Sequence, residues 1–289
     1  VGRRARGGRV VLRIEDLDGP RVKPESIERL IADLRWMGLD WDEGPDVGGA
    51  YGPYVQTERL ARYEEAFERL RDERLVYPCQ CSRTDIERAA SAPHVGDEGP
   101  PYPGTCRDRA DVPSEDAAWR LRVDSSPLVT DDAFVGCRTW NLESLCGDFV
   151  IRKRSGTAAY QLAVVVDDAL MGVTEVVRGD DLLSSTPRQL LLYRRLGWPP
   201  PTFYHVPLVV GPDGRRLAKR HGDTRLERFR AAGVRPERLV GWLAATCGLV
   251  EPGASGLPQE FIDRFEWSKA PRERIVCDEA AALRALAYD

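Results

Sequence analysis

Four potential metal ligands lie close together in the first half of the sequence. Cys79 and Cys81 are separated by one residue, and a stretch rich in Pro and Gly lies between them and Tyr102 and Cys106. Three thiolates and one further donor suit a tetrahedral zinc ion, which would supply folding energy to a segment with little apolar core. On spacing alone the fourth donor is Tyr102 or His94. Buried core cysteines are the alternative; we favour zinc because two thiols one residue apart are uncommon.

A basic loop carries a second set of chemically suggestive residues. Residues 214–222 read Gly-Arg-Arg-Leu-Ala-Lys-Arg-His-Gly, and residues 213–230 contain seven Lys or Arg against three Asp or Glu. A lysine placed where negative charge develops on phosphates lowers the barrier to nucleotidyl transfer. Lys219 is the candidate for that role. The alternative is a solvated charged turn, and the residue types do not decide between the two.

Charged residues also follow three segments that we predict to be strands. They are Glu15 after residues 10–14, Asp167 after residues 162–166, and Arg178 and Asp180 after residues 173–177. An arginine in such a place can form a forked ion pair with a ligand carboxylate, and a glutamate can hold an ammonium group. Taken singly, each has a structural alternative: Arg178 can pair with Asp180, and Glu15 can cap the following helix. Tyr160 is an equally weak signal alone.

The surrounding elements set where these residues would meet. Periodicity and helix-start signals predict helices from Pro24, over residues 60–70, and from Thr186 (as N-cap) to Leu196. Two further strands are predicted at residues 149–152 and 205–210. Strands that alternate with helices indicate an α/β fold with a doubly wound parallel sheet, in which ligands bind beyond the carboxyl ends of the strands.

We expect four parts along the chain. Residues 1–76 form the first part of a Rossmann-like catalytic domain, residues 77–148 an inserted zinc-containing module, and residues 149–224 the second part of the catalytic domain. Residues 225–289 form a small helical subdomain, with short helices expected at residues 236–247, 259–265 and 279–287.

Length and composition exclude several classes of protein. The 289 residues carry 42 Lys or Arg against 46 Asp or Glu, a net charge of -4, so any contact with nucleic acid must be local. The longest apolar run, residues 162–166, is far too short for a membrane helix, and the basic start lacks a signal-peptide pattern. Seven cysteines without such a signal argue against a disulfide framework. We expect a cytoplasmic protein.

Taken in order, several motifs resemble those of the glutamate-specific class I aminoacyl-tRNA synthetases. They are Arg-Ile-Glu-Asp-Leu-Asp at 13–18, Asp-Trp-Asp-Glu-Gly-Pro at 40–45, Ala-Val-Val-Val-Asp-Asp at 163–168, Val-Arg-Gly-Asp-Asp-Leu at 177–182, His-Val-Pro-Leu at 205–208 and Arg-Leu-Ala-Lys-Arg at 216–220. The last is a variant of the mobile KMSKS loop. The resemblance covers nearly the whole chain, and the ordered set is specific. It implies a class I synthetase catalytic fold.

Within that family, the chain is most similar to shortened members that lack the anticodon-binding helical domain, because only 69 residues (221–289) follow Arg220. The resemblance to this group implies one structural zinc ion with Cys79, Cys81, Tyr102 and Cys106 as ligands. It thereby favours Tyr102 over His94 as the fourth ligand.

The resemblance also implies roles for the other candidates. Glu15 would contact the ammonium group of glutamate, Tyr160 would line the glutamate pocket, and Arg178 would bind a carboxylate. Lys219 would stabilise the phosphates of ATP, bound with Mg²⁺, during attack by glutamate. The ATP-binding loop would consist of Arg216, Leu217, Ala218, Lys219 and Arg220.

The shortened members transfer the activated glutamate to queuosine in the anticodon loop of tRNA(Asp), so the implied partners are glutamate, ATP and that tRNA. We expect a monomer with no membrane partner. No HIGH-type signature precedes Val10, so we expect that the family's first strand and helix are missing from this sequence. Two alternatives stay open: a truncated glutamyl-tRNA synthetase catalytic domain that acylates a tRNA 3' end, and a non-catalytic paralogue that binds RNA or an amino acid.

Overall fold

The computed structural model describes residues 7–17, 24–89, 99–215 and 226–287, which divide between two compact units. Unit 1 comprises Val1–Ile14, Asp18–Tyr54 and Val206–Asp289, and unit 2 comprises Glu15–Leu17 and Val55–His205. Both units contain helices and strands, so the α/β class predicted from the sequence is confirmed.

Unit 2 holds most of the secondary structure. Its elements are η3 (Gln56–Glu58), α2 (Leu60–Asp72), β1 (Val76–Cys79), α3 (Arg83–Ala89), β2 (Ala118–Leu121), β3 (Leu128–Asp132), β4 (Gly136–Trp140), α4 (Leu142–Leu145), β5 (Phe149–Arg152), α5 (Tyr160–Leu170), β6 (Glu175–Gly179), η4 (Asp180–Ser185), α6 (Thr186–Leu196) and β7 (Thr202–Val206). The predicted range of β5 is confirmed to the residue, and α6 ends at Leu196 as predicted but begins at Thr186, which was predicted as its N-cap.

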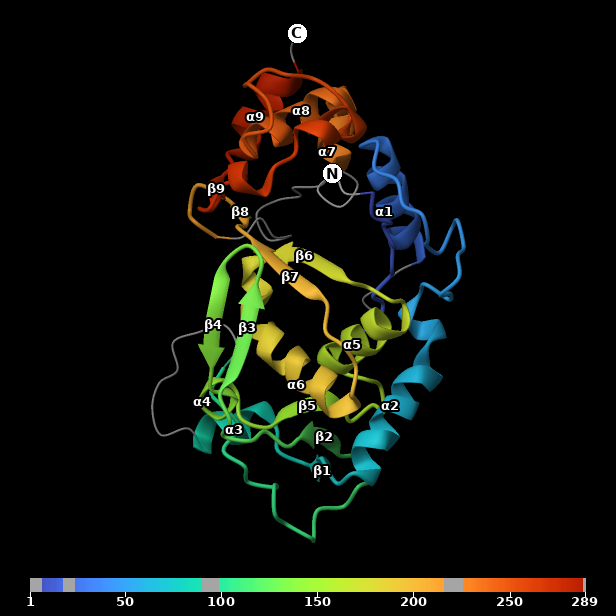
Figure 1. Ribbon diagram of the computed structural model, residues 1–289, viewed down its shortest axis with the longest axis vertical. Helices are drawn as coiled ribbons and strands as arrows, with labels where there is room; N and C mark the ends of the chain where they lie inside the picture. Colours follow the sequence, from blue (N-terminus) through green and yellow to red (C-terminus); the bar gives the residue numbers. More distant parts are fainter. Residues whose placement is uncertain (1–6, 18–23, 90–98, 216–225, 288–289) are drawn as a thin grey trace. The chain divides into compact units, whose positions relative to one another are not determined.

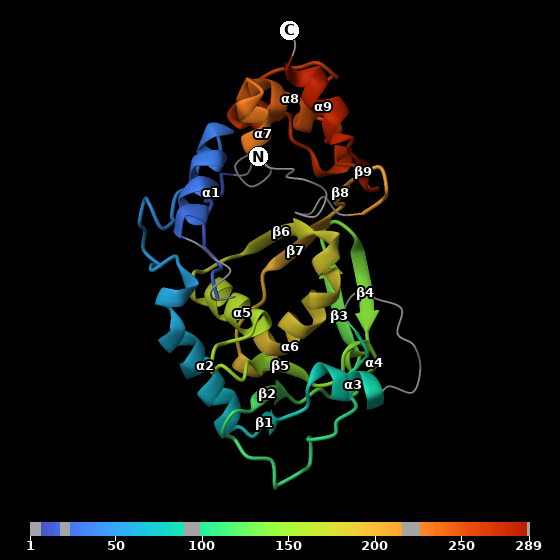
Figure 2. The same cartoon turned by 180° about the vertical axis from the view of Figure 1, so that it is seen from behind.

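Helices α2, α5 and α6 lie side by side and supply much of the core of unit 2 (Figures 1 and 2). On α2, Tyr63, Phe67 and Leu70 are buried and recur at helical spacing, as predicted. On α5, every residue from Leu162 to Asp168 is buried. Burial of apolar surface on three neighbouring helices therefore stabilises this unit.

Residues 162–166, predicted as a strand, belong to helix α5 instead. The prediction was wrong because a short apolar run looks the same in a buried strand and in a helix that is buried on all sides. Such a helix has no polar face, so its 3.6-residue period is hidden.

The strands that the structure describes form small sheets rather than the one doubly wound parallel sheet expected. β1, β2 and β5 form an antiparallel sheet, β3 and β4 an antiparallel hairpin, and β6 neighbours β7. Residues 10–14 are an extended segment with an isolated bridge from Val11 to Glu43, and not a continuous buried strand. The predicted strand at 205–210 is divided between β7 and β8 at Pro207, which has no N–H to donate.

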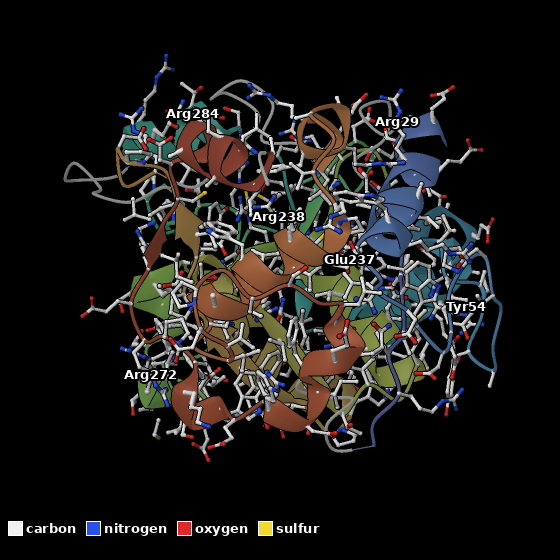
Figure 3. All side chains as sticks on the ribbon, turned by 90° about the horizontal axis from the view of Figure 1, so that it is seen from above. Arg29, Tyr54, Glu237, Arg238, Arg272 and Arg284 are labelled. Atoms are coloured by element: carbon white, nitrogen blue, oxygen red, sulfur yellow. The ribbon has the colours of Figure 1, made fainter. Side chains whose placement is uncertain are left out.

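Unit 1 contains α1 (Pro24–Trp36), β8 (Val209–Val210), α7 (Leu226–Ala231), α8 (Pro236–Thr246), η6 (Pro258–Arg264), η7 (Trp267–Lys269), β9 (Ile275–Val276) and α9 (Glu279–Ala287). β8 and β9 pair in parallel. Arg238 lies on α8 (Figure 3). It donates a hydrogen bond to the backbone carbonyl of Ala285 on α9 at 3.1 Å. The predicted helix at 259–265 is a 3₁₀ helix, η6.

None of the helices in the described part of the chain is both long enough and apolar enough to cross a bilayer.

Candidate functional site

Two of the predicted glutamate-binding residues are neighbours in unit 2. Tyr160 is the first residue of α5, and its side chain hydrogen-bonds to that of Arg178 on β6. Tyr160 is 39% exposed and Arg178 is partly buried, so the pair is open to solvent on the tyrosine side. Arg178 lies within β6, although the sequence predicted that it would follow the strand.

Buried groups hold the Arg178 guanidinium on its other side. Its Nε donates to Nε2 of His205 at 2.9 Å, and one terminal nitrogen donates to Oγ1 of Thr186 at 2.8 Å. The guanidinium carbon lies 4.9 Å from the ring centroid of Phe203. Burial lowers the pKa of Arg178 from its usual value, but an arginine still keeps its charge at neutral pH.

His205 connects Arg178 to a buried carboxylate. Its Nδ1 lies 2.6 Å from Oδ2 of Asp132, and both side chains are almost completely buried. Burial lowers the pKa of His205 below 6.5 and outweighs the opposing effect of Asp132. The hydrogen-bond pattern assigns a neutral imidazole, in which Nδ1–H donates to Asp132 and Nε2 accepts from Arg178.

Asp132 is itself held by the hairpin that carries it. Its Oδ1 accepts from the backbone N–H groups of Phe134 at 2.9 Å and Val135 at 2.8 Å. Asp132 pairs with Gly136 across a loop of three residues, and Gly136 has φ 84°, which glycine adopts without steric cost. Burial would raise the pKa of Asp132, but the hydrogen bonds from Val135 and His205 reverse that effect and leave it below its usual value.

Asp167, expected beside the ligand, has a structural role instead. It is fully buried in α5 and accepts hydrogen bonds from Arg59 at 2.6 Å and Gln56 at 2.9 Å, and from the hydroxyl of Tyr63. These contacts join α5 to η3 and α2. The adjacent Asp168 instead acts electrostatically on Arg178.

Glu15 is exposed and lies in unit 2. The next residue, Asp16, accepts hydrogen bonds from the backbone N–H and the hydroxyl of Thr57, at 2.9 and 2.6 Å. Lys219 and the rest of the predicted ATP-binding loop, residues 216–220, lie outside the described residues, as does His94.

The four predicted metal ligands come together at one end of β1. The sulfur atoms of Cys79, Cys81 and Cys106 all lie within 4.8 Å of one another. The hydroxyl of Tyr102 lies 3.4 Å from Sγ of Cys79 and 3.8 Å from Sγ of Cys81. Three soft sulfur donors and one oxygen at such separations fit a tetrahedral zinc ion. Burial raises the pKa of the Cys81 thiol to about 11, and that of the Tyr102 phenol above its usual value, so a bound cation would have to stabilise their anionic forms.

A buried arginine adjoins this cluster. Nε of Arg120 donates to Sγ of Cys79 at 3.2 Å, and its guanidinium lies 3.8 Å from the centre of the Tyr102 ring. A fixed cation beside Cys79 would offset the negative charge of a metal–thiolate centre.

The loop that carries Tyr102 is held tightly against Gly147. Tyr102 donates its backbone N–H to the carbonyl of Cys146 at 2.9 Å, and a Cβ on Gly147 would lie 2.4 Å from the Tyr102 carbonyl oxygen. Only glycine fits there, so this close approach fixes the backbone of Tyr102. None of the seven cysteines is joined in a disulfide, and Cys137 is exposed.

No part in ligand binding was predicted for Asp132, Thr186 or His205. His205 belongs to the His-Val-Pro-Leu motif at 205–208, which was the available signal. Thr186, predicted as an N-cap, is the first residue of α6, and its hydroxyl contacts Arg178 and His205. Their common contacts around Arg178 join residues that are distant in the sequence.

Comparison with known proteins gives the same family as the sequence motifs. The family model for tRNA synthetases class I (E and Q), catalytic domain, matches residues 3–283. A glutamyl-Q tRNA(Asp) synthetase of Symbiobacterium thermophilum is 51% identical over 290 residues, which cover 97% of this chain and 90% of that protein. A glutamate–tRNA ligase 2 of Syntrophus aciditrophicus is 39% identical over 96% of this chain but only 58% of its own length.

The fold agrees with a solved structure. The glutamate-tRNA synthetase from Elizabethkingia anophelis superimposes with a TM-score of 0.81 at 25% identity. The match covers 98% of this chain and 63% of that chain.

Proposed function

This chain belongs to the class I tRNA synthetases of the E and Q type, and from that membership we propose that it activates glutamate with ATP and transfers it to queuosine in tRNA(Asp). The observation that carries the proposal is the degree of sequence identity. The chain is 51% identical to a glutamyl-Q tRNA(Asp) synthetase and 39% identical to a glutamate–tRNA ligase.

The reaction has two steps. A glutamate carboxylate oxygen attacks the α-phosphorus of ATP, giving glutamyl-adenylate and pyrophosphate. A hydroxyl of the queuosine cyclopentenediol then attacks the acyl carbon and releases AMP. The mixed anhydride is already activated, so positioning and electrostatic stabilisation suffice for the second step.

The chain's own residues take these roles in the proposal. The cation of Arg178 binds a substrate carboxylate, and Tyr160 beside it lines the same pocket. Glu15 holds the ammonium group, and Lys219, with Arg216, Leu217, Ala218 and Arg220, stabilises the phosphates of Mg²⁺-bound ATP. A structural zinc ion at Cys79, Cys81, Tyr102 and Cys106 holds the module together, supported by the clustering of these four side chains.

The test follows the transferred glutamate. The full-length natural protein is incubated with ATP, labelled glutamate and queuosine-containing tRNA(Asp), and the modified base is separated from the terminal adenosine. We expect the label on the base, and glutamate-dependent pyrophosphate exchange without tRNA. Label on the 3' adenosine would indicate an ordinary glutamyl-tRNA synthetase, and the absence of any exchange would indicate a binding protein without catalysis.

A further inference from the structure

The Arg178 guanidinium has five N–H donors, and the protein occupies them unevenly. Nε and one terminal nitrogen are engaged by His205 and Thr186, and Phe203 covers one side of the group. Tyr160 contacts the same side chain and is partly exposed. The buried contacts thus fix the plane of the guanidinium, which also hydrogen-bonds to the partly exposed Tyr160.

We propose that His205 is a positioning residue that, backed by Asp132, fixes the Arg178 guanidinium for the carboxylate of glutamate. The inference rests on the proposed function, because the proposed function is what makes Arg178 a binding residue for a substrate carboxylate. His205 does not touch the substrate; its effect passes through Arg178.

The geometry requires a neutral acceptor at Nε2 of His205. Asp132 Oδ2 accepts from Nδ1 at 2.6 Å, so the ring proton lies on Nδ1 and the lone pair of Nε2 faces Nε of Arg178 at 2.9 Å. Neither His205 nor Asp132 can turn toward water, since their side chains are 0% and 1% exposed. A guanidinium held in this way meets a carboxylate without first losing side-chain freedom.

Protonation of His205 would replace its hydrogen bond from Arg178 with repulsion. The charged groups that face its ring are Asp132 from β3, Arg178 from β6 and Asp180 from η4. An imidazolium would present an N–H and a positive charge to Arg178, which itself donates and is positive. Because burial lowers the pKa of His205 below 6.5, the neutral form persists at neutral pH, and the contact is lost only as the pH falls through that lowered value.

Two substitutions test the hydrogen bonds at the two ring nitrogens of His205 one at a time. His205→Asn places an amide near Nδ1 and keeps the Asp132 contact, whereas His205→Gln places an amide oxygen near Nε2 and keeps an acceptor for Arg178. We measure steady-state pyrophosphate exchange with glutamate and ATP varied in turn, between neutral and mildly acidic pH.

We expect His205→Asn to raise the KM for glutamate by about tenfold or more, the usual effect of losing a hydrogen bond to a charged group, and to leave the KM for ATP within about twofold. His205→Gln should stay within about threefold of the wild type and lose the acid-side rise in KM for glutamate. A second pair of variants controls for misfolding caused by a change at position 205. Asp132→Asn should raise the KM for glutamate, whereas Asp131→Asn, at the exposed neighbouring residue, should not.

The results separate the two proposals. Absence of exchange in the wild type would overturn the proposed function, and this inference with it. Normal wild-type exchange together with an unchanged KM for glutamate in His205→Asn, or equal increases in the Asn and Gln variants, would overturn the inference alone. Equal loss of melting temperature in both variants without a change in KM would show that His205 only supports the fold.

Discussion

At the scale of single residues, burial decides the role of a charge. Arg59 and Asp167 are paired at 2.6 Å with both side chains 0% exposed. Removing one partner of such a pair leaves the other charge buried without compensation. We predict that Arg59→Met lowers the free energy of unfolding by about 3 kcal/mol, measured by urea denaturation.

The control for this change is an exposed arginine on α2, the helix that Arg59 directly precedes. Arg71 pairs with Glu68 on α2, and its side chain is 47% exposed. Arg71→Met should alter the free energy of unfolding by no more than about 0.5 kcal/mol. Equal losses in the two variants would mean that burial does not set the strength of the Arg59 pair.

Lys219 is the residue whose proposed role is most directly chemical. If it stabilises charge on the phosphates, Lys219→Ala should slow glutamyl-adenylate formation by about a hundredfold or more, as removal of one electrostatic contact to a transition state does. Pre-steady-state adenylate formation measures the rate. The matched control is Lys153→Ala, which lies outside the loop, and an unchanged rate in Lys219→Ala would remove Lys219 from the mechanism.

At the scale of elements, β1 and the loop around Tyr102 depend on one cluster of donors. The sequence placed four candidate ligands across 28 residues, 79–106, and the structure brings them together. The nearby apolar core contains only Tyr77, Cys79, Tyr102 and Cys106 as buried members among the described residues. A bound zinc ion would therefore supply much of the stability of this segment.

We predict that Cys106→Ser abolishes stoichiometric zinc binding and makes the segment that follows β1 sensitive to protease, since a structural site needs all its ligands. Metal content by plasma mass spectrometry and limited proteolysis give the result. Cys137→Ser, at an exposed cysteine on β4, should retain zinc and resist protease like the wild type. Retention of zinc by Cys106→Ser would exclude Cys106 as a ligand.

At the scale of the whole molecule, the chain does not divide at simple points along its length. Unit 1 takes residues from both ends of the chain, while unit 2 combines Glu15–Leu17 with Val55–His205. Tyr160, Arg178, His205 and the metal cluster all belong to unit 2. The four-part division at residues 76, 148 and 224 stays a prediction of the domain organisation, whereas the two units describe compactness.

Much of this molecule could be predicted from local patterns. Pro187 indicated a helix that ends at Leu196, one residue shorter at its start than α6, and the residues of β5 were predicted without error. The spacing of Cys79, Cys81 and Cys106 pointed to one cluster with Tyr102 or His94, and the ordered motifs pointed to the family. Such features depend on residues close in the chain or on the order of motifs along it, both of which a sequence contains.

Only the tertiary structure decided which polar residues work together. His205 meets Arg178 across 27 positions and Asp132 across 73, and Arg59 meets Asp167 across 108. No local period encodes such pairs, because the packing of separate elements brings them into contact. The same packing buries α5 on all sides and hides its helical period, so residues 162–166 read as a strand until the fold was known.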